Sequence, residues 1–346
     1  MSFSLDNIIR TNIKQMKPYS SARDEFKGEA DVYLDANENP FENGYNRYPD
    51  PLQIKVKERL AAIKNTKVEN IILGNGSDEI IDLLIRACCE PGKDAILLAE
   101  PTYGMYNVCA QVNNVTVKKI SLTKEFQLDW NALHEVDLSN VKITFICSPN
   151  NPSGNSLNKE DIVSWIKQSP GIVVVDEAYI DFANDEGFLP MLNQFPNLVV
   201  MQTFSKAWGM AGLRLGIGYA STELITILNK IKYPYNINAF TQSFALQQLN
   251  RYENIRKQVN EILTEREKLT LALAKLSSVL NIYPSDANFL LVKVKEARKM
   301  YLRLQQQGIV VRDRSNVLLC DDCLRITIGT VDENKKLIEA IKDFSL

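Results

Sequence analysis

Short apolar runs alternate with helix-like segments along most of the chain. Six such runs end abruptly in polar, Gly-bearing or Pro-bearing segments: residues 71–74, 95–100, 143–149, 171–178, 198–205 and 215–220. Segments between them, such as 77–90 and 158–168, carry apolar residues at the spacing of amphipathic helices. The runs are apolar at consecutive positions, as strands covered by helices on both faces are. The pattern predicts an α/β fold built on a wound, mainly parallel sheet.

A second, smaller unit is expected after a long helical stretch. From about residue 240 to 280 the pattern is helical, almost free of Gly and Pro, and long enough to bridge two domains. Further apolar runs and helical segments follow to the C-terminus, whereas the first forty residues lack a strong period. We therefore expect an N-terminal arm over 1–40 that completes small-domain or dimer contacts, a large domain over 41–250 and a small α/β domain over 251–346.

Composition and charge narrow the class of protein. The 346 residues are 45% hydrophobic and 24% charged, with a formal net charge of −2, which are ordinary values for a folded globular protein. Nothing in the basic runs points to nucleic acid, and no apolar run approaches the length of a membrane span. The N-terminus has no signal-peptide pattern, so we expect a cytoplasmic protein with small-molecule partners.

The cysteines and the single histidine exclude several chemistries. Six cysteines lie mostly in apolar stretches, as reduced core cysteines do, and the one C-x-x-C, Cys320 and Cys323, lacks the second ligand pair of a zinc site. We therefore expect no metal. His134 is the only histidine and lies in a polar stretch, NALHEVDLSN, which disfavours a Ser-His-Asp triad and most histidine-based acid–base schemes. Enzyme chemistry in this chain would rest on Lys, Tyr, a carboxylate or a cofactor.

Polar side chains follow several of the predicted strands at the point where each strand ends. Residues 74–79 (GNGSDE) form a Gly-containing turn that opens a helix, which suits an anion such as phosphate but also occurs as a plain turn. Asp176 ends a buried run and needs a cationic or hydrogen-bonding partner, for which a protonated ring nitrogen would serve. Lys206 ends another run, with Arg214 eight residues on, and a desolvated lysine can form a Schiff base with an aldehyde. Strand ends of this kind are where wound sheets bind ligands.

These features belong to a longer set of motifs. In order, the segments are YLDANENPF (33–41), NRYPDP (46–51), GNGSDEII (74–81), EPTYGMY (100–106), CSPNNPSGN (147–155), VVVDEAYIDF (173–182), TFSKAWGMAGLRLGIG (203–218), VVRDRS (310–315) and CLRITIGT (323–330). Together they resemble the fold-type I pyridoxal-phosphate enzymes of the aspartate aminotransferase superfamily, most closely its histidinol-phosphate branch. The resemblance implies a large domain with a mainly parallel seven-stranded sheet covered by helices, a smaller C-terminal domain, an N-terminal arm and a homodimer.

The resemblance also implies a cofactor and its ligands. Pyridoxal 5′-phosphate would form a Schiff base with Lys206, which then acts as base and acid, while Asp176 pairs with the pyridine nitrogen. Tyr179 and Asn151 would donate to the phenolic oxygen, and Tyr103 would stack on the ring. The implied phosphate ligands are Gly76, Ser77, Asp78, Thr203, Ser205 and Arg214, with Tyr48 reaching the phosphate of the neighbouring subunit.

Substrate recognition is implied by fewer residues. Arg325 and Arg312 match the arginines that receive the substrate phosphate and, in the other half-reaction, the carboxylate of glutamate. Tyr19 and Asn37 match arm residues that line the same pocket. The alternative for Arg312 and its neighbour Arg314 is a solvated charge cluster.

The resemblance implies amino-group transfer between L-histidinol phosphate and 2-oxoglutarate, giving imidazole acetol phosphate and L-glutamate, in L-histidine biosynthesis. A threonine-phosphate decarboxylase or an aromatic amino-acid aminotransferase shares much of the motif set. A non-catalytic protein that retained the fold is disfavoured because Lys206, Asp176, Tyr179, Asn151 and Arg214 are all present.

Overall fold

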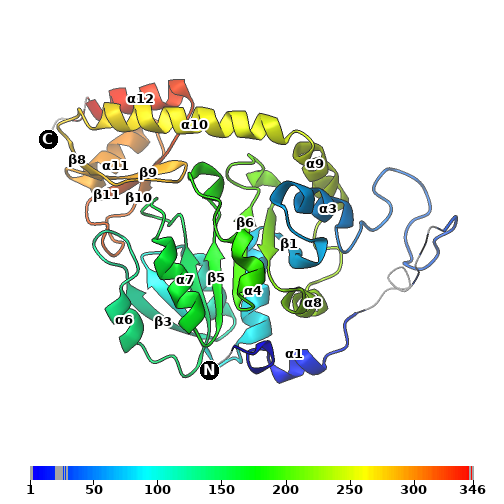
Figure 1. The fold of residues 1–346 in the computed structure, drawn as a ribbon. Helices are drawn as coiled ribbons and strands as arrows, with labels where there is room; N and C mark the ends of the chain where they lie inside the picture. The colour runs from blue at the N-terminus through cyan, green and yellow to red at the C-terminus, as the bar shows by residue number, and fades with distance from the viewer. Residues whose placement is uncertain (1–2, 20–25, 27, 29, 343, 345–346) are drawn as a thin grey trace.

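The chain folds around two β-sheets, one large and one small. The structure, a computed structural model, describes residues 3–19, 26, 28, 30–342 and 344. Figure 1 shows the larger sheet with its helices in the lower body and the smaller sheet above it, beneath the long helix α10. The chain therefore has the large and small α/β units that its pattern predicts.

The large sheet has seven strands in the order β1-β7-β6-β5-β4-β2-β3. These are β1 (Ile71–Asn75), β2 (Ala95–Glu100), β3 (Thr116–Ser121), β4 (Val141–Cys147), β5 (Ile172–Asp176), β6 (Leu198–Thr203) and β7 (Leu215–Tyr219). Only β7 runs against the others, because it pairs antiparallel with both β1 and β6 while the remaining pairs are parallel. The mainly parallel sheet is thereby confirmed.

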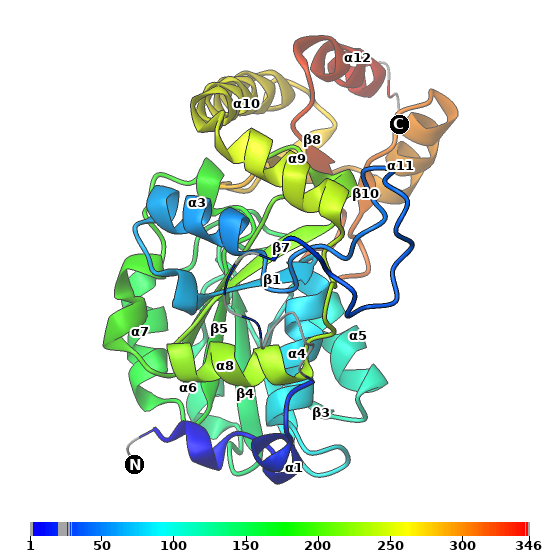
Figure 2. The same cartoon turned by 90° about the vertical axis from the view of Figure 1, so that its right-hand side faces the viewer.

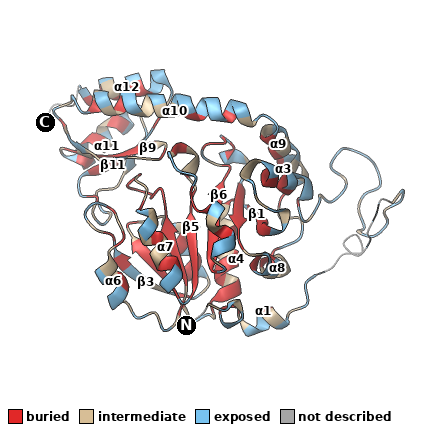
Figure 3. Cartoon of the chain, viewed as in Figure 1, coloured by how far each residue is buried: buried red, intermediate tan, exposed pale blue. Residues whose placement is uncertain are grey.

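Helices cover both faces of this sheet, and Figure 2 shows α4 and α7 on opposite sides of the strands. The helical elements of the large unit are η1 (Leu5–Asn7), α1 (Thr11–Gln15), α3 (Ile54–Lys64), η2 (Val68–Asn70), α4 (Ser77–Cys88), α5 (Met105–Val112), α6 (Trp130–Glu135), α7 (Lys159–Gln168), η3 (Ile180–Phe182), η4 (Leu189–Gln194), η5 (Ala211–Leu213), α8 (Thr222–Ile231) and α9 (Ala239–Leu249). Figure 3 shows the strands buried between layers whose outer surfaces are exposed.

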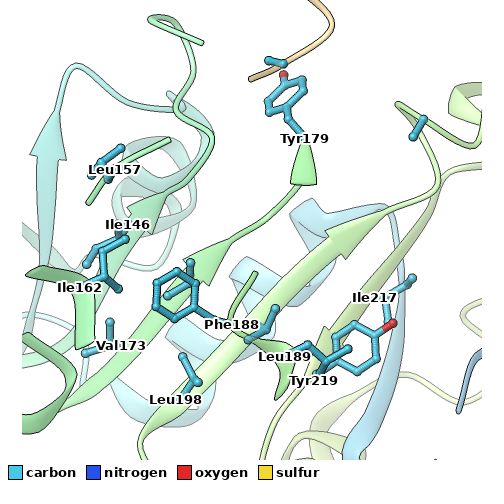
Figure 4. Packing of buried hydrophobic residues seen from close by; sticks show 14 of the residues in the cluster. Ile146, Leu157, Ile162, Val173, Tyr179, Phe188, Leu189, Leu198, Ile217 and Tyr219 are labelled. Atoms are coloured by element: carbon cyan, nitrogen blue, oxygen red, sulfur yellow. The ribbon is translucent and has the colours of Figure 1, made fainter. Parts of the chain in front are cut away.

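Successive residues of a strand pack alternately into the cores on the two faces of the sheet. On β5, Val173 and Val175 join the core that α3 and α7 cover, whereas Val174 joins the core of α4, α5 and α8. This division explains the consecutive apolar residues of the runs, since both faces must be buried. Figure 4 shows part of the first core, with Val173 and Leu198 among the strands and Tyr179 beyond a strand end.

The small sheet is antiparallel, with the order β10-β11-β9-β8. Its elements are β8 (Val279–Ile282), β9 (Phe289–Val294), α11 (Ala297–Gln306), β10 (Arg312–Asp313), β11 (Cys323–Thr327) and α12 (Val331–Lys342). Helix α10 (Tyr252–Leu273) packs Leu269 and Leu273 into the core of this unit. The small unit therefore has its own core, although the predicted domain limits themselves stay a prediction.

The start of the chain packs against the large unit before the chain leaves it. Ile8, Ile9 and Ile13 enter the core on the α4 side, and Arg10 Nε donates to Glu90 at 3.1 Å. The described residues between α1 and α3 then loop away from the body, as Figure 1 shows. Of these, Leu34 and Phe41 are exposed by 88% and 80%.

The structure differs from the pattern-based expectations in three places. All six apolar runs are strands, but β3 has no such run, because it lies at an edge of the sheet and carries Lys118 and Lys119. The stretch from 240 to 280 is not one helix: it breaks at Asn250 between α9 and α10 and ends before β8. Residues 309–314, one of the apolar runs that follow the long helical stretch, give only the two paired residues of β10. All six cysteines are buried and free.

Among the residues that the structure describes, no helix is both long and apolar enough to cross a bilayer.

Gly216 on β7 offers a test of how closely the sheet approaches the turn after β1. A Cβ at this position would collide with the backbone nitrogen of Ser77 and the carbonyl of Gly76. We expect Gly216→Ala to lower the free energy of unfolding by about 1–3 kcal/mol in urea titrations, because the crowded backbone must shift. Gly212→Ala is the control, since a Cβ there has no heavy atom within 4 Å. Equal stability of the two variants would contradict the close approach.

Candidate active site

A cavity of about 660 Å³ lies where most strands of the large sheet end. Strands β1, β2, β4, β5 and β6 all point their carboxyl ends to this edge, because only β7 is reversed. The small domain contributes the far wall through the hairpin of β10 and β11. Residues that are distant in the sequence therefore line one space between the two sheets.

Asp176 is the last residue of β5, and its carboxylate is buried at the edge of this cavity. Tyr106 Oη donates to Oδ2 at 2.6 Å, and the backbone nitrogen of Ala178 donates to Oδ1 at 3.1 Å. Burial raises the pKa of Asp176 to about 6 although both hydrogen bonds favour the charged form. Among the described residues, no cationic side chain reaches salt-bridge distance of this carboxylate. The site is therefore suited to an added cation, such as a protonated ring nitrogen.

Lys206 follows β6 and points into the same cavity. Hydrogen bonds from Gly209 N to the Lys206 carbonyl and from Met210 N to the Phe204 carbonyl close the turn that carries it. Its Nζ lies 5.6 Å from the centre of the Tyr179 ring. Burial, and then the positive charge of Arg325, lower the pKa of Lys206. A larger neutral fraction of the amine makes this lysine a better nucleophile and base.

An anion-binding nest lies between β1 and β7. Helix α4 begins at Ser77 without a side-chain cap, so its first backbone N–H groups point outward. Gly76 has φ of 78°, a conformation that favours glycine, and a Cβ there would stand 2.7 Å from Arg214 Nη2. Both the backbone conformation and the close approach of the guanidinium therefore require glycine at this position. The hydroxyl of Thr203 lies 3.1 Å from that of Ser205 beside this turn. Together these groups can cradle a phosphate.

Asp78 is an acidic side chain that lines the cavity beside the nest. Arg214 Nη2 lies 3.4 Å from its Oδ2, and Tyr103 Oη donates to its Oδ1 at 3.1 Å. The carboxylate is thereby turned toward the arginine and the tyrosine. This arrangement leaves the backbone N–H groups of the α4 N-terminus free for an anion.

Tyr179 and Asn151 form a pair on the other side of Lys206. Asn151 Nδ2 lies 3.5 Å from Tyr179 Oη, and its Oδ1 accepts a hydrogen bond from Arg325 of the small domain. Burial raises the pKa of Tyr179, so its phenol stays protonated and can donate. Figure 4 shows the tyrosine reaching past the end of its strand.

Two arginines face each other across the small-domain hairpin. Arg312 on β10 lies directly opposite Arg325 on β11, a pairing of like charges that destabilises a sheet. Arg325 also lies 5.3 Å above the ring of Phe289. Among the described residues, neither guanidinium has a carboxylate at salt-bridge distance. An unneutralised pair of this kind calls for an anionic ligand.

Most of the residues singled out in the sequence meet in this cavity. Its lining includes Ser77, Asp78, Tyr103, Asn151, Asp176, Tyr179, Thr203, Ser205, Lys206, Arg214, Arg312 and Arg325. Gly76 adjoins it at the start of α4. Three do not line it: Tyr19 is exposed by 71%, and Asn37 and Tyr48 line a separate cavity of about 430 Å³. There Tyr48 stacks on Tyr235 at 4.5 Å.

Tyr106 and Arg314 are among the polar residues at the site that the sequence reasoning misses. Tyr106 lies in the EPTYGMY segment, but it is buried on the inner face of α5, where an aromatic residue is expected simply to pack. Arg314 lines the cavity next to Arg312 although it equally fits a solvated charge cluster. Its position two residues after Arg312, on the same side of an extended chain, is the signal that points to it.

Comparison with known proteins places this geometry in a family. A model of the family "Aminotransferase class I and II" matches residues 29–341. A curated histidinol-phosphate aminotransferase from Parabacteroides distasonis is 56% identical over 342 residues, which are 99% of both chains. The crystal structure of the histidinol-phosphate aminotransferase from Clostridium acetobutylicum has a TM-score of 0.78 at 27% identity, covering 86% of this chain and 90% of that one. A Sinorhizobium meliloti structure of the same name, in complex with pyridoxal-5′-phosphate, has a TM-score of 0.79 at 24% identity and covers 86% and 82%.

The raised pKa of Asp176 predicts a pH dependence of stability in protein freed of bound small molecules. Because the folded state holds this proton more tightly than the unfolded state, the stability contribution falls as pH rises from about 4 to 6. Asp176→Asn removes that fall. The free energy of unfolding of the variant, relative to that of the wild type, should therefore rise by about 2–3 kcal/mol between pH 4 and pH 7 in urea titrations.

Asp321→Asn, at an exposed position outside the cavity, is the matched control for the loss of one acidic side chain. Burial also raises the pKa of Glu177, to about 7, but Glu177 is present in all three proteins and cancels in the comparison. Stability curves of wild type and Asp176→Asn that stay parallel across this range would contradict the buried, uncompensated carboxylate.

Proposed function

Since the chain belongs to the class I and II aminotransferase family, we propose that it transfers the amino group of L-histidinol phosphate to 2-oxoglutarate. The products are imidazole acetol phosphate and L-glutamate, as in L-histidine biosynthesis. The proposed substrate rests on the full-length match to the histidinol-phosphate aminotransferase of Parabacteroides distasonis. The cross-strand pair of Arg312 and Arg325 supports it independently, because two guanidinium forks suit a phosphate in one half-reaction and a carboxylate in the other.

Pyridoxal 5′-phosphate is the cofactor that the site fits. The uncompensated Asp176 carboxylate suits its pyridine nitrogen, and the nest at Gly76 and Ser77, with Thr203, Ser205 and Arg214, suits its phosphate. Tyr103 would stack on the ring, and Tyr179 with Asn151 would donate to its phenolic oxygen. When bound, the cofactor supplies an aldehyde that carries the amino group and a ring that withdraws electrons from the substrate Cα.

Lys206 is the residue to which we assign the covalent link and the proton transfer. The lowered pKa of its Nζ leaves more of the amine neutral, so Lys206 would accept the proton that leaves the substrate Cα and would deliver it to the cofactor carbon bonded to the substrate nitrogen. Asp176 keeps the ring nitrogen protonated, because a buried carboxylate strongly favours a cation beside it. The hydrogen bond from Tyr106 fixes the orientation of the carboxylate for this task.

The complete site is proposed to need a second copy of the chain. Tyr48 would reach the cofactor phosphate of the neighbouring subunit, and Tyr19 and Asn37 would line its substrate pocket, since none of the three lines the cavity of its own chain. The exposed apolar side chains of this region, Leu34 and Phe41 among them, support a homodimer that covers them. The cytoplasm is the proposed location, in keeping with six free cysteines.

A donor comparison tests the proposed reaction. Purified protein with bound cofactor is mixed with 2-oxoglutarate and one of four donors: histidinol phosphate, threonine phosphate, phenylalanine or tyrosine. We expect glutamate formation with a kcat/KM at least about tenfold higher for histidinol phosphate, because the full-length relative is named for this substrate and its phosphate is the anion that the arginine pair suits. Carbon dioxide release from threonine phosphate without glutamate would instead identify a lyase. Preference for phenylalanine or tyrosine would identify an aromatic aminotransferase.

Lys206→Ala should abolish turnover while the fold survives. Its cofactor should bind without a covalent link, because the contacts to the phosphate and the ring remain. Borohydride reduction followed by peptide mass spectrometry should find the cofactor on the Lys206 peptide of the wild type and on no peptide of the variant. Lys232→Ala, at a buried lysine outside the cavity, is the control and should keep the adduct. Appreciable turnover by Lys206→Ala would show that another lysine does the chemistry.

A further inference from the structure

We propose that Arg314 is a third anion ligand of the small-domain hairpin and the residue that selects a phosphate monoester over a carboxylate. The identity of the phosphorylated substrate rests on the proposed function. The selection itself rests on the geometry of the hairpin and on the different number of oxygens that the two anions present.

Backbone geometry places Arg314 beside the arginine pair. Along an extended chain alternate side chains share a face, so Arg314 lies on the side of Arg312 and Asp313 on the other. Asp313 indeed turns away to Arg298, whose Nη1 lies 3.4 Å from its carboxylate. The Arg314 backbone is held by hydrogen bonds from its nitrogen to the Cys323 carbonyl at 2.9 Å and from Val317 N to its carbonyl at 2.8 Å.

Within the part of the chain that the structure describes, the side chain of Arg314 lacks the carboxylate partner that a structural arginine has. Its Nε is fully buried and has no hydrogen-bond acceptor among the described residues, although the side chain as a whole is only partly buried. None of the described carboxylates lies within salt-bridge distance of its guanidinium. Burial and the charges of Arg325 and Arg312 lower its pKa. A buried, unsatisfied donor beside two like charges is costly unless an anion is bound.

The chemistry of the two anions decides what a third guanidinium can do. A carboxylate offers two oxygens and one negative charge, which the forks of Arg312 and Arg325 can satisfy between them. A phosphate monoester offers three terminal oxygens and nearly two charges, so one oxygen is left over for another donor. Arg314 supplies that donor from the same face of the hairpin. Its contact is therefore made with phosphate and not with carboxylate.

Binding of two non-reactive ligands to the holoenzyme tests this selection. Methyl phosphate and glutarate carry the two kinds of anion without an amino group, and calorimetric titration gives the Kd of each. We expect Arg314→Gln to weaken methyl phosphate by about 10- to 100-fold, which is the effect of one charge-assisted hydrogen bond, and glutarate by less than about threefold. Arg314→Lys should fall between, because a single ammonium keeps the charge but loses the fork.

Two further variants serve as references for the effect of Arg314→Gln on ligand binding. Arg256→Gln removes one arginine from an exposed position on α10, paired with Glu253, and should leave both Kd values unchanged. Arg325→Ala should weaken both ligands together, because that guanidinium serves either anion. Equal weakening of both ligands by Arg314→Gln, or no weakening of methyl phosphate, would overturn the assignment.

Steady-state kinetics separate this inference from the proposed function. In the full reaction Arg314→Gln should raise the KM for histidinol phosphate by a similar factor and leave the KM for 2-oxoglutarate nearly unchanged. A wild-type enzyme that ignores histidinol phosphate would refute the proposed substrate, while the ligand titrations would still decide the role of Arg314. A wild-type enzyme that uses histidinol phosphate, with a variant equally impaired toward both substrates, would refute the role of Arg314 alone.

Discussion

The carboxylate of Asp176, buried at the end of β5 with no salt-bridge partner among the described residues, is the constraint on which the site depends. A charge in this position is tolerated because Tyr106 and the backbone of Ala178 donate hydrogen bonds to it, yet burial still raises its pKa. The stacking of Tyr106 on Phe145 ties the donor to the core of the large domain. In the proposed function, this carboxylate at the ring nitrogen and the nest at the phosphate hold the cofactor at two points, so that its reactive end faces Lys206.

The second constraint is an excess of positive charge around the same cavity. Five basic side chains line it in the described chain, from Lys206 and Arg214 to the three hairpin arginines, against the carboxylates of Asp78 and Asp176. Such an imbalance destabilises the empty protein and favours anions at the nest of the large domain and at the hairpin of the small domain. Arg325 connects the two, since it donates to Asn151 across the domain boundary. An anion bound by Arg325 at the hairpin therefore acts, through this hydrogen bond, on Asn151, which pairs with Tyr179.

The chemistry that follows a buried strand could be predicted because it is adjacent in the sequence to a recognisable apolar run. Asp176 and Lys206 are examples, and the common direction of their strands brings them together. Tyr106 could not be predicted, since a tyrosine on the apolar face of a helix has the same pattern whether it packs or hydrogen-bonds. The placement of the Arg314 side chain at the cavity depends on the register of a two-residue strand, β10, which the sequence pattern does not give. In the proposed function, the positions of Tyr19 and Tyr48 relative to a site depend on a second chain, which one sequence does not place.

The edge strand β3 has a consequence beyond its absence from the apolar pattern. Lys118 and Lys119 interrupt the strand and are held by Asp137 and Glu100 at 2.9 Å each, so the last strand of the large sheet presents charge along its length. A row of unpaired backbone groups at a sheet edge otherwise recruits strands from other molecules, and lysines are a common protection against it. Lys118 and Lys119 thus both remove the hydrophobic pattern by which β3 could be predicted and protect the edge of the sheet against pairing with other molecules.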